Sequence, residues 1–303
     1  MKFIDEKDVF EKIAVRTPYY ALKNLKQEGD EVKAIIPIEQ PLEMEIPPIT
    51  AAEAARHLAV LGSCAGSFCL NSGNEKRFYI ATAGNMQRVT NNVTSKFPYL
   101  YGTAKSVMLN KRKAISDTRI ETPEGEVIYN IHIDYYIINA KVFARLYKEF
   151  EKDMRKTNRK DNLSKQEIML LKKQRKNLYK NAYPNTTYSI NGDSMNVSLG
   201  KIGPEYCMGH FPLYPAFPIA FLMYQKFYAG GYFLKHLIKK DNIRYMLKEA
   251  DLKAMDFAFA GEILNIKVDF INTIGKDYTF CCKSFTEAGK HVGQLDFILT
   301  LDA

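Results

Sequence analysis

The stretch Gly209-His210-Phe211-Pro212-Leu213-Tyr214-Pro215-Ala216-Phe217-Pro218 decides the fold of this chain, and it leads directly into the apolar segment Ile219–Tyr228. Each proline fixes φ and removes a backbone donor, so the loop cannot continue as helix or strand before Pro218. Pro218 suits the first position of a helix, where its missing N–H costs nothing. The stretch therefore predicts a stiff loop that presents the His210 imidazole beside the free N–H groups of a first helical turn.

The loop resembles the catalytic loop of the 3-hydroxyacyl-acyl-carrier-protein dehydratases, in which Gly-His-Phe-Pro-x-x-Pro-x-x-Pro-Gly enters a central helix. After Gly209, the residues that match in order and spacing are His210, Phe211, Pro212, Pro215 and Pro218. Two positions differ, because Ile219 replaces the family's glycine and Tyr224 replaces its acidic residue. The resemblance implies a hotdog fold, in which a curved antiparallel sheet wraps a central helix. A proline-rich connector with an incidental histidine is the alternative.

Length and composition set the class of protein. The 303 residues are enough for two ordinary domains, and the hydrophobic share of 46% is that of a globular protein. No stretch resembles a signal peptide or approaches about 18 apolar residues without charges, so we expect a cytoplasmic protein with no integral membrane segment. The five cysteines lack ligand-like or disulfide-like spacing, which predicts a reducing compartment and no metal or other cofactor.

The net charge of +9 is concentrated between Arg145 and Lys180, where thirteen Lys and Arg residues outnumber five Asp and Glu residues. A basic, helix-favouring segment can attract RNA, an anionic membrane or an acidic protein. Nucleic acid is not an expected partner, because the segment has few aromatic residues and no nucleic-acid-binding motif. Acyl carrier proteins are acidic, so Lys172–Lys176 either steers a carrier-bound substrate or belongs to a solvated linker helix.

Two similar halves flank this basic segment. In the first, Pro47-Pro48 precedes a helix expected over 50–66, followed by strand patterns at 77–83, 99–109, 117–122 and 126–138. In the second, Pro218 opens a helix expected to reach Lys240 with an interruption at Gly230-Gly231. Strand patterns follow at 257–260, 263–270, 278–285 and 292–301. Each half thus reads as one long helix followed by an antiparallel meander.

The repeat predicts an α+β fold, a double hotdog with two antiparallel sheets, each wrapped around a central helix and joined as a pseudo-dimer. The closing turns support the repeat, because one precedes a strand carrying Asp134-Tyr135 and the other a strand carrying Asp296-Phe297. We place the first hotdog unit at 1–144, a basic helical linker at 145–182, and the second unit at 183–303. The pseudo-dimer lies within one chain, and further homo-oligomerisation stays open.

The first predicted helix carries a polar cluster. Glu53, Arg56 and His57 stand at i, i+3 and i+4 and therefore share one helix face. A central hotdog helix is largely covered, and burying three ionisable groups without partners is costly. The cluster is therefore either part of a functional site or a structural ion pair between Glu53 and Arg56 with a solvated His57.

By the resemblance, each dehydratase site pairs a histidine loop from one unit with a carboxylate on the other unit's central helix. Only one such site can form here, because only the second half carries the Gly-His-Phe-Pro loop. Aligning Pro48 with Pro218 puts Ala54 at the acid position, next to Glu53. Starting the first helix two residues later puts Arg56 there instead, and the sequence leaves this register open.

The resemblance then implies a dehydratase, a hydro-lyase that acts on 3-hydroxyacyl thioesters of an acyl carrier protein or of coenzyme A. His210 would remove the α-proton, Glu53 would protonate the leaving hydroxyl, and the N–H of Ile219 would hold the thioester oxygen. Further substrate contacts are expected from Gly209, Phe211, Pro218 and Tyr224. The alternatives are a thioesterase of the same fold, or a subunit that binds acyl thioesters without catalysis.

Overall fold

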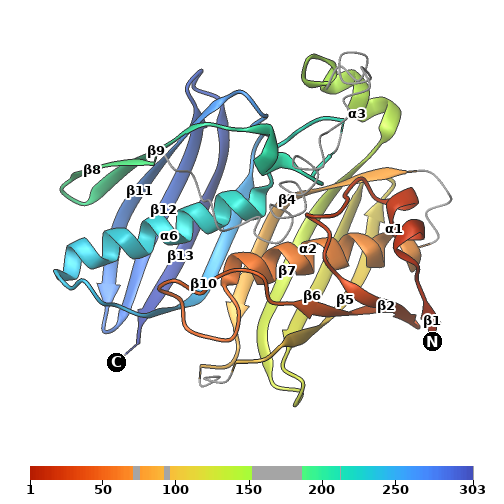
Figure 1. Cartoon of the computed structure of the whole chain (residues 1–303), viewed down its shortest axis with the longest axis horizontal. Coiled ribbons are helices and arrows are strands. Elements are labelled where there is room, and N and C mark those ends of the chain that lie inside the picture. Colours follow the sequence, from red (N-terminus) through yellow and green to blue (C-terminus); the bar gives the residue numbers. More distant parts are fainter. Residues whose placement is uncertain (71–75, 92–95, 152–185, 212, 303) are drawn as a thin grey trace, which may run out of the picture.

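The computed structural model describes residues 1–70, 76–91, 96–151, 186–211 and 213–302. Its strands form one continuous antiparallel sheet in the order β1-β2-β3-β5-β6-β7-β4-β10-β13-β12-β11-β9-β8. Two long helices, α2 and α6, lie along the same face of this sheet (Figure 1). They also contact each other where the two halves of the chain meet. The predicted double hotdog is confirmed.

The first unit is built around α2 (Ala51–Phe68). Its strands are β1 (Lys2–Phe3), β2 (Lys23–Glu28), β3 (Glu31–Pro37), β4 (Arg77–Arg88), β5 (Tyr99–Asn110), β6 (Lys113–Glu121) and β7 (Val127–Asn139). A short helix, α1 (Glu6–Lys12), lies between β1 and β2 in the chain, and α3 (Ala140–Leu146) with the 3₁₀ turn η1 (Lys148–Phe150) follows β7. The α2 helix packs mainly on β5 and β6, so small residues such as Ala51, Ala54 and Ala65 are fully buried.

The second unit repeats the arrangement around α6 (Ile219–Ile238). Its strands are β8 (Thr187–Asn191), β9 (Ser194–Lys201), β10 (Tyr245–Ala254), β11 (Ile263–Ile274), β12 (Asp277–Thr286) and β13 (His291–Leu301), with the 3₁₀ turn η2 (Pro204–Cys207) before the helix. The units join where β4 pairs with β10, from Glu249 opposite Gln87 to Lys253 opposite Ala83. This pairing makes the two sheets one.

In each central helix one glycine packs against an aromatic side chain of the closing strand, and this contact shows which residues of the two helices correspond. Gly62 of α2 lies under the Tyr135 hydroxyl, and Gly230 of α6 lies under the Phe297 ring. Both glycines are the twelfth residue of their helix, counting from Ala51 and from Ile219. Tyr135 and Phe297 also follow the two Asp residues that match in the closing strands. The helices therefore correspond from their first residues, and Arg56 occupies the position of Tyr224.

The helix starts differ slightly from expectation. Thr50 caps α2, with its hydroxyl accepting the N–H of Glu53 at 3.2 Å. Pro218 is the cap of α6 rather than its first residue. The α6 helix continues through Gly230-Gly231 without interruption, because both glycines are covered by rings, those of Phe297 and Tyr245.

One strand prediction of the second half is wrong, and the sequence analysis missed β8, β9 and β10. The segment 257–260 is not a strand, and only an isolated bridge joins Phe259 to Ala216. The strand that corresponds to β4 is β10, and its charged residues Lys248, Glu249, Asp251 and Lys253 conceal the strand pattern. Pairing with β4 on one edge and β13 on the other makes it a central strand. Long-range pairing therefore overrode local sequence preference.

Most of the predicted basic linker, including Lys172–Lys176, lies outside the described residues. Its described beginning, 145–151, contributes Tyr147 and Phe150, which pack against Phe257 and Phe259 beside the loop that precedes α6. None of the helices in the described ranges is both long and apolar enough to cross a membrane.

The glycine contact predicts the effect of a substitution at position 230. A Cβ on Gly230 would lie 2.6 Å from the Phe297 Cζ, so Gly230→Val should lower the free energy of unfolding by about 2–3 kcal/mol in urea denaturation. His236→Ala, at an exposed position of the same helix, should change it by less than about 0.5 kcal/mol. Adding Phe297→Leu should recover part of the loss, and a double variant without recovery would contradict the assigned contact.

Candidate functional site

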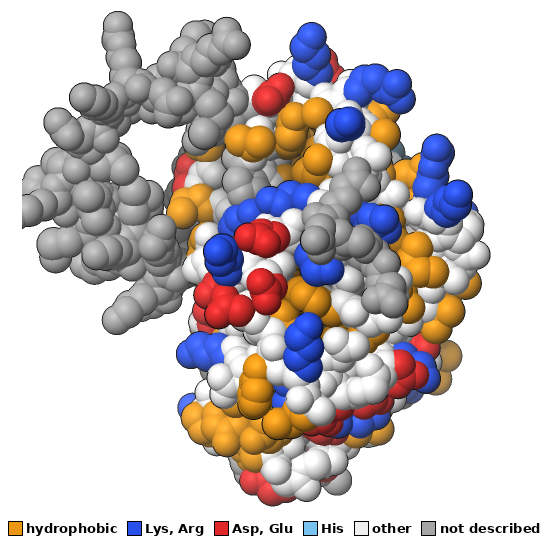
Figure 2. Space-filling model, turned by 90° about the vertical axis from the view of Figure 1, so that its right-hand side faces the viewer, with side chains coloured by type: hydrophobic (Ala, Val, Ile, Leu, Met, Phe, Trp, Pro, Cys, Tyr) orange, Lys and Arg blue, Asp and Glu red, His pale blue; other side chains and the backbone are white. Residues whose placement is uncertain are grey.

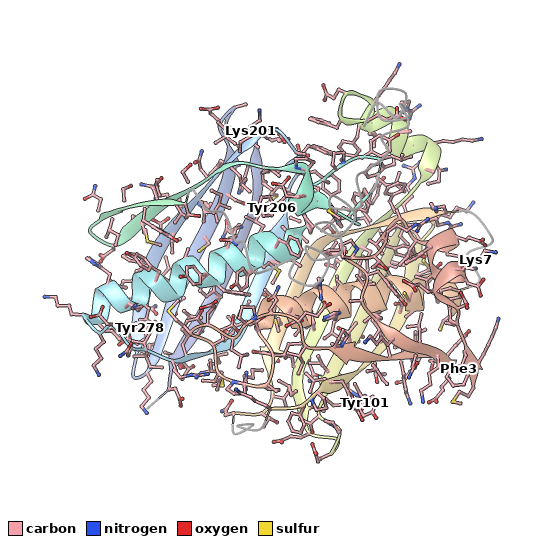
Figure 3. The ribbon with its side chains drawn as sticks, in the orientation of Figure 1. Phe3, Lys7, Tyr101, Lys201, Tyr206 and Tyr278 are labelled. Carbon is pink, nitrogen blue, oxygen red and sulfur yellow. The ribbon has the colours of Figure 1, made fainter. Side chains whose placement is uncertain are left out.

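A cavity of about 250 Å³ lies at the junction of the two units and contains His210. We call it the His210 cavity. The first unit contributes residues of α2, β4 and β7 to its wall, and the second contributes the loop before α6, the first turns of α6 and the end of β10. Figure 3 shows Tyr206 of η2, just ahead of the histidine loop, beside the end of α6 that points to the first unit. The loop thus enters the molecule at the junction.

His210 is held in one orientation. Its Nδ1 lies 3.0 Å from the carbonyl oxygen of Ala216, and a carbonyl only accepts, so Nδ1 carries the proton. The lone pair of the neutral ring is therefore on Nε2. The Phe211 ring stacks on the imidazole at a centroid distance of 4.1 Å. Burial lowers the pKa of His210 to about 4, so the ring is neutral and able to accept a proton near pH 7.

The N-terminal segment 13–20 covers the loop, a feature that the sequence analysis missed. The N–H of Arg16 donates to the carbonyl of Gly209 at 2.8 Å, and a Cβ on Gly209 would lie 2.3 Å from the Arg16 oxygen. Gly209 also has a positive φ of 80°. Glycine is therefore required here for the close approach of two backbones. The approach brings the Tyr19 ring within 4.9 Å of the His210 ring.

The first turn of α6 contributes backbone donors. The first N–H groups of a helix have no partner within the helix, and Pro218 offers no side-chain cap. Among the described residues, the N–H groups of Ile219 and Ala220 make no hydrogen bond. Ile219 lines the His210 cavity, as its predicted role requires. These donors and the imidazole therefore belong to the same site.

Hydroxyl groups line the first-unit wall of the cavity. Ser63 Oγ and Tyr135 Oη both donate to the carbonyl of Ala59, at 2.9 and 2.7 Å. Their protons are thus committed, and their oxygens can still accept a hydrogen bond. Asp256 is the only acidic residue among the described residues of the wall, and its carboxylate accepts the N–H of Phe257.

A second, narrow cavity of about 40 Å³ continues from the first between the two central helices. We call it the apolar channel. Both cavities are lined by Tyr19, Ala59, Ala81 and Ile219, so they adjoin. The other wall residues are small or apolar, among them Ala55, Ala83, Gly84, Met223 and Ala250. The channel is therefore narrow and almost wholly apolar.

The structure does not bring Glu53, Arg56 and His57 to the His210 cavity. All three are buried, as a covered helix predicts. The Glu53 carboxylate accepts the N–H groups of Glu39 and Gln40, at 2.6 and 3.0 Å. The cavity meets a different face of α2, formed by Ala59, Val60 and Ser63. The predicted residues and the cavity wall thus share the helix α2 but lie on different faces of it.

The polar cluster is held together by the Arg56 guanidinium. Its Nη2 donates to the Glu39 carboxylate, and lies 2.8 Å from His57 Nε2 and 3.9 Å from Glu53 Oε1. Burial raises the pKa of Glu53 to about 7, while Arg56 and the two backbone donors oppose that shift. Glu39, Glu53 and His57 could also hold a metal ion, but the guanidinium already supplies the positive charge there. The arrangement resembles the predicted structural ion pair, with His57 buried rather than solvated.

Tyr224 also lies away from His210. It belongs to the same unit as His210 but faces the other half-site, where burial, together with the charges of Glu43 and Glu45, raises the pKa of its hydroxyl. Those two residues belong to the loop before α2, which corresponds to the histidine loop. The second half-site therefore contains acidic residues where the first has an imidazole. The Tyr19 ring, by contrast, lies beside His210, and burial raises the pKa of its hydroxyl to about 12, although the charge of Arg56 opposes this shift.

Comparisons with known proteins agree on the architecture. No model of a known protein family and no curated protein sequence matches the chain. Among solved structures, a candidate oleoyl thioesterase from Lactobacillus plantarum is 9% identical with a TM-score of 0.58, and the match covers 90% of this chain and 96% of that one. An acyl-CoA thioesterase II from Mycobacterium marinum is 12% identical with a TM-score of 0.53, covering 92% and 95%. A 12:0-ACP thioesterase from Umbellularia californica is 7% identical with a TM-score of 0.50, covering 90% and 95%.

At such low identity these matches show the double hotdog fold. The hotdog part of the sequence resemblance is confirmed, and the lyase prediction is wrong. The three solved structures above, which match over both units, are named thioesterases, and thioesterases are hydrolases. Glu53, which the sequence analysis assigned as the proton donor of a dehydratase, does not line the cavity of His210.

The Arg56 cluster predicts a large stability effect. Arg56 is fully buried, and Arg56→Leu leaves Glu39 and Glu53 without their cation. We expect the free energy of unfolding, measured in urea, to fall by about 3–5 kcal/mol. Arg119→Leu removes an exposed arginine on β6 and should cost less than about 1 kcal/mol. Equal effects of the two substitutions would show that the buried cluster contributes no special stability.

Proposed function

We propose that this protein hydrolyses acyl thioesters at the junction of its two hotdog units. The observation that carries the proposal is the continuity of the two cavities. One holds a neutral histidine and free backbone donors, and the other is a narrow apolar channel between the central helices. A thioester needs both surroundings, because its carbonyl reacts in a polar site while its acyl chain must be buried. The names of the matching solved structures support this class of substrate.

His210 is the general base of the proposed reaction. Nδ1 is held as a donor by Ala216, so Nε2 takes a proton from a water molecule as that water attacks the thioester carbonyl carbon. When the tetrahedral intermediate collapses, the carbon–sulfur bond breaks. The departing thiolate then takes the proton back from the imidazolium. The products are a carboxylic acid and a free thiol, and the histidine is regenerated.

The helix start supplies the electrostatic stabilisation. Negative charge develops on the carbonyl oxygen during the attack, and the N–H groups of Ile219 and Ala220 are available donors at the positive end of α6. Replacing the family's glycine by Ile219 does not remove these backbone donors. The isoleucine side chain instead lines both the cavity and the channel, where it contacts the acyl chain.

A second function is supported by one observation. Catalytic histidines are often oriented by a carboxylate, but the partner of His210 is the neutral carbonyl of Ala216. Such a site also suits a subunit that binds acyl thioesters without turning them over. In both candidate functions the protein binds an acyl thioester, and the carrier of the acyl group is an acyl carrier protein or coenzyme A.

If His210 is the general base, its substitution should lower kcat, and kcat/KM should depend on pH through its protonation. His210→Gln should lower kcat about 10²- to 10⁴-fold toward an acyl thioester, measured by release of free thiol. The wild-type kcat/KM should be level near neutral pH and fall as the pH drops through about 4, because protonation removes the lone pair. An unperturbed histidine would give that fall near pH 6.5.

Controls separate catalysis from folding and from binding. Tyr224→Phe, in the half-site without histidine, should leave kcat within about twofold of the wild type. A His210→Gln variant that keeps its affinity for a non-hydrolysable acyl thioether has lost only catalysis. Full hydrolysis by that variant would contradict the proposed base, and binding without hydrolysis by the wild type would favour the non-catalytic subunit.

The channel predicts a chain-length effect. Ala59 lies where the two cavities adjoin, so the ring of Ala59→Phe should block the channel while leaving His210 in place. We expect kcat/KM to fall at least about tenfold for long acyl chains and much less for acetyl thioesters, because only long chains enter the channel. Val60→Phe, at the cavity wall but outside the channel, is the matched control. Equal losses for all chain lengths would place the acyl group elsewhere.

A further inference from the structure

A basic pocket adjoins the His210 cavity at one end of the first unit. Its volume is about 270 Å³. Its cations come from three elements: Arg77 begins β4, Lys111 and Arg112 form the turn between β5 and β6, and Arg145 lies on α3. Figure 1 shows the start of β4 and α3 together at the upper right of the molecule. Chain segments that are far apart in sequence therefore direct positive charge to one place.

The charges of the basic pocket are not neutralised by the protein. Its wall contains no Asp or Glu among the described residues, and none of its four cations forms an ion pair with a described residue. Elsewhere on the sheet lysines are paired, as in Lys33 with Glu28 and Lys248 with Asp277. The end view in Figure 2 shows several Lys and Arg side chains with few acidic ones in the upper part of that face. Gathered cations without counter-charges attract a multiply charged anion.

The basic pocket and the His210 cavity share a wall. Tyr136 and Ile138, near the end of β7, line both. A ligand that leaves the His210 cavity past these two residues therefore reaches the cations directly. The apolar channel, which we assigned to the acyl chain, adjoins the cavity at other residues, among them Ala59 and Ile219.

We propose that the basic pocket binds the phosphate groups of coenzyme A while the thioester lies beside His210. This inference rests on the proposed function and names the carrier of the acyl group. Coenzyme A carries a 3′-phosphate and a 5′-pyrophosphate at the end of its pantetheine arm. Arginine guanidinium groups and a lysine ammonium group bind phosphate oxygens through charge-assisted hydrogen bonds. A phosphopantetheine arm on a carrier protein has a single phosphodiester, which uses the four cations less fully.

The second unit offers an internal comparison. The turn between β11 and β12 corresponds to the turn between β5 and β6, because Leu301 donates its N–H to Lys276 just as Ile137 donates to Arg112, at 3.0 and 2.7 Å. In the second unit Lys276 is followed by Asp277, which pairs with Lys248. The β5–β6 turn of the first unit thus contributes cations to the basic pocket beside the His210 cavity. At the corresponding β11–β12 turn of the second unit there is an ion pair between Asp277 and Lys248 instead.

Titration calorimetry with coenzyme A, pantetheine and adenosine 3′,5′-bisphosphate tests the proposal without requiring turnover. The wild type should bind coenzyme A and the bisphosphate, and added salt should weaken both. Arg112→Glu replaces an exposed side chain, and should weaken both ligands at least about tenfold while leaving pantetheine unchanged. Lys276→Glu, at the corresponding turn, is the matched control and should change none of them.

The outcomes separate this proposal from the hydrolase proposal. Coenzyme A affinity that is unchanged in Arg112→Glu, or reduced equally in Lys276→Glu, would overturn the phosphate site. Loss of turnover on a carrier-protein thioester, with coenzyme A affinity unaffected by Arg112→Glu, would also overturn it in favour of a protein carrier. If coenzyme A binds and Arg112→Glu abolishes that binding while no thioester is hydrolysed, the phosphate site stands and the hydrolase proposal fails.

Discussion

The antiparallel pairing of β4 with β10 is the interaction on which the rest of the structure depends. It turns two sheets into one and sets the two central helices against each other. The pairing brings the small-residue face of α2 opposite the first turn of α6, and both cavities lie at that contact. Neither unit alone would enclose either cavity. A single hotdog unit would instead expose the edge strand and its apolar face to water.

The two half-sites of the pseudo-dimer have diverged in their chemistry. One contains an imidazole, free backbone donors and a neighbouring group of cations. The other contains Tyr224 with Glu43 and Glu45, and has no histidine in the corresponding loop. Fusing two copies into one chain permits this division, because substitutions in one half-site do not appear in the other. Identical subunits of a homodimer would have to carry both sets of residues twice.

Burial has opposite consequences for the ionisable groups of the two regions. Glu53 and Arg56 form a buried ion pair, and because the pair is buried, removing one partner costs a large free energy of unfolding. At His210 burial keeps the ring neutral, and the Ala216 carbonyl selects the tautomer with its lone pair on Nε2. The first region therefore stabilises α2 and its preceding loop. The second is suited to proton transfer.

The sequence by itself determined the two central helices and, through the resemblance of the histidine loop, the double hotdog, because proline positions, alternating strands and matching turns are local signals. It could not determine that β10 is the central strand next to β4, since charged residues conceal the pattern of β10. Nor could it identify Tyr19, Ser63 or Tyr135 as neighbours of the histidine. The tertiary structure alone decided which face of α2 meets the cavity, because helix rotation is set by packing: Gly62 under Tyr135 turns Glu53 and His57 toward their own loop and Ala59 toward His210.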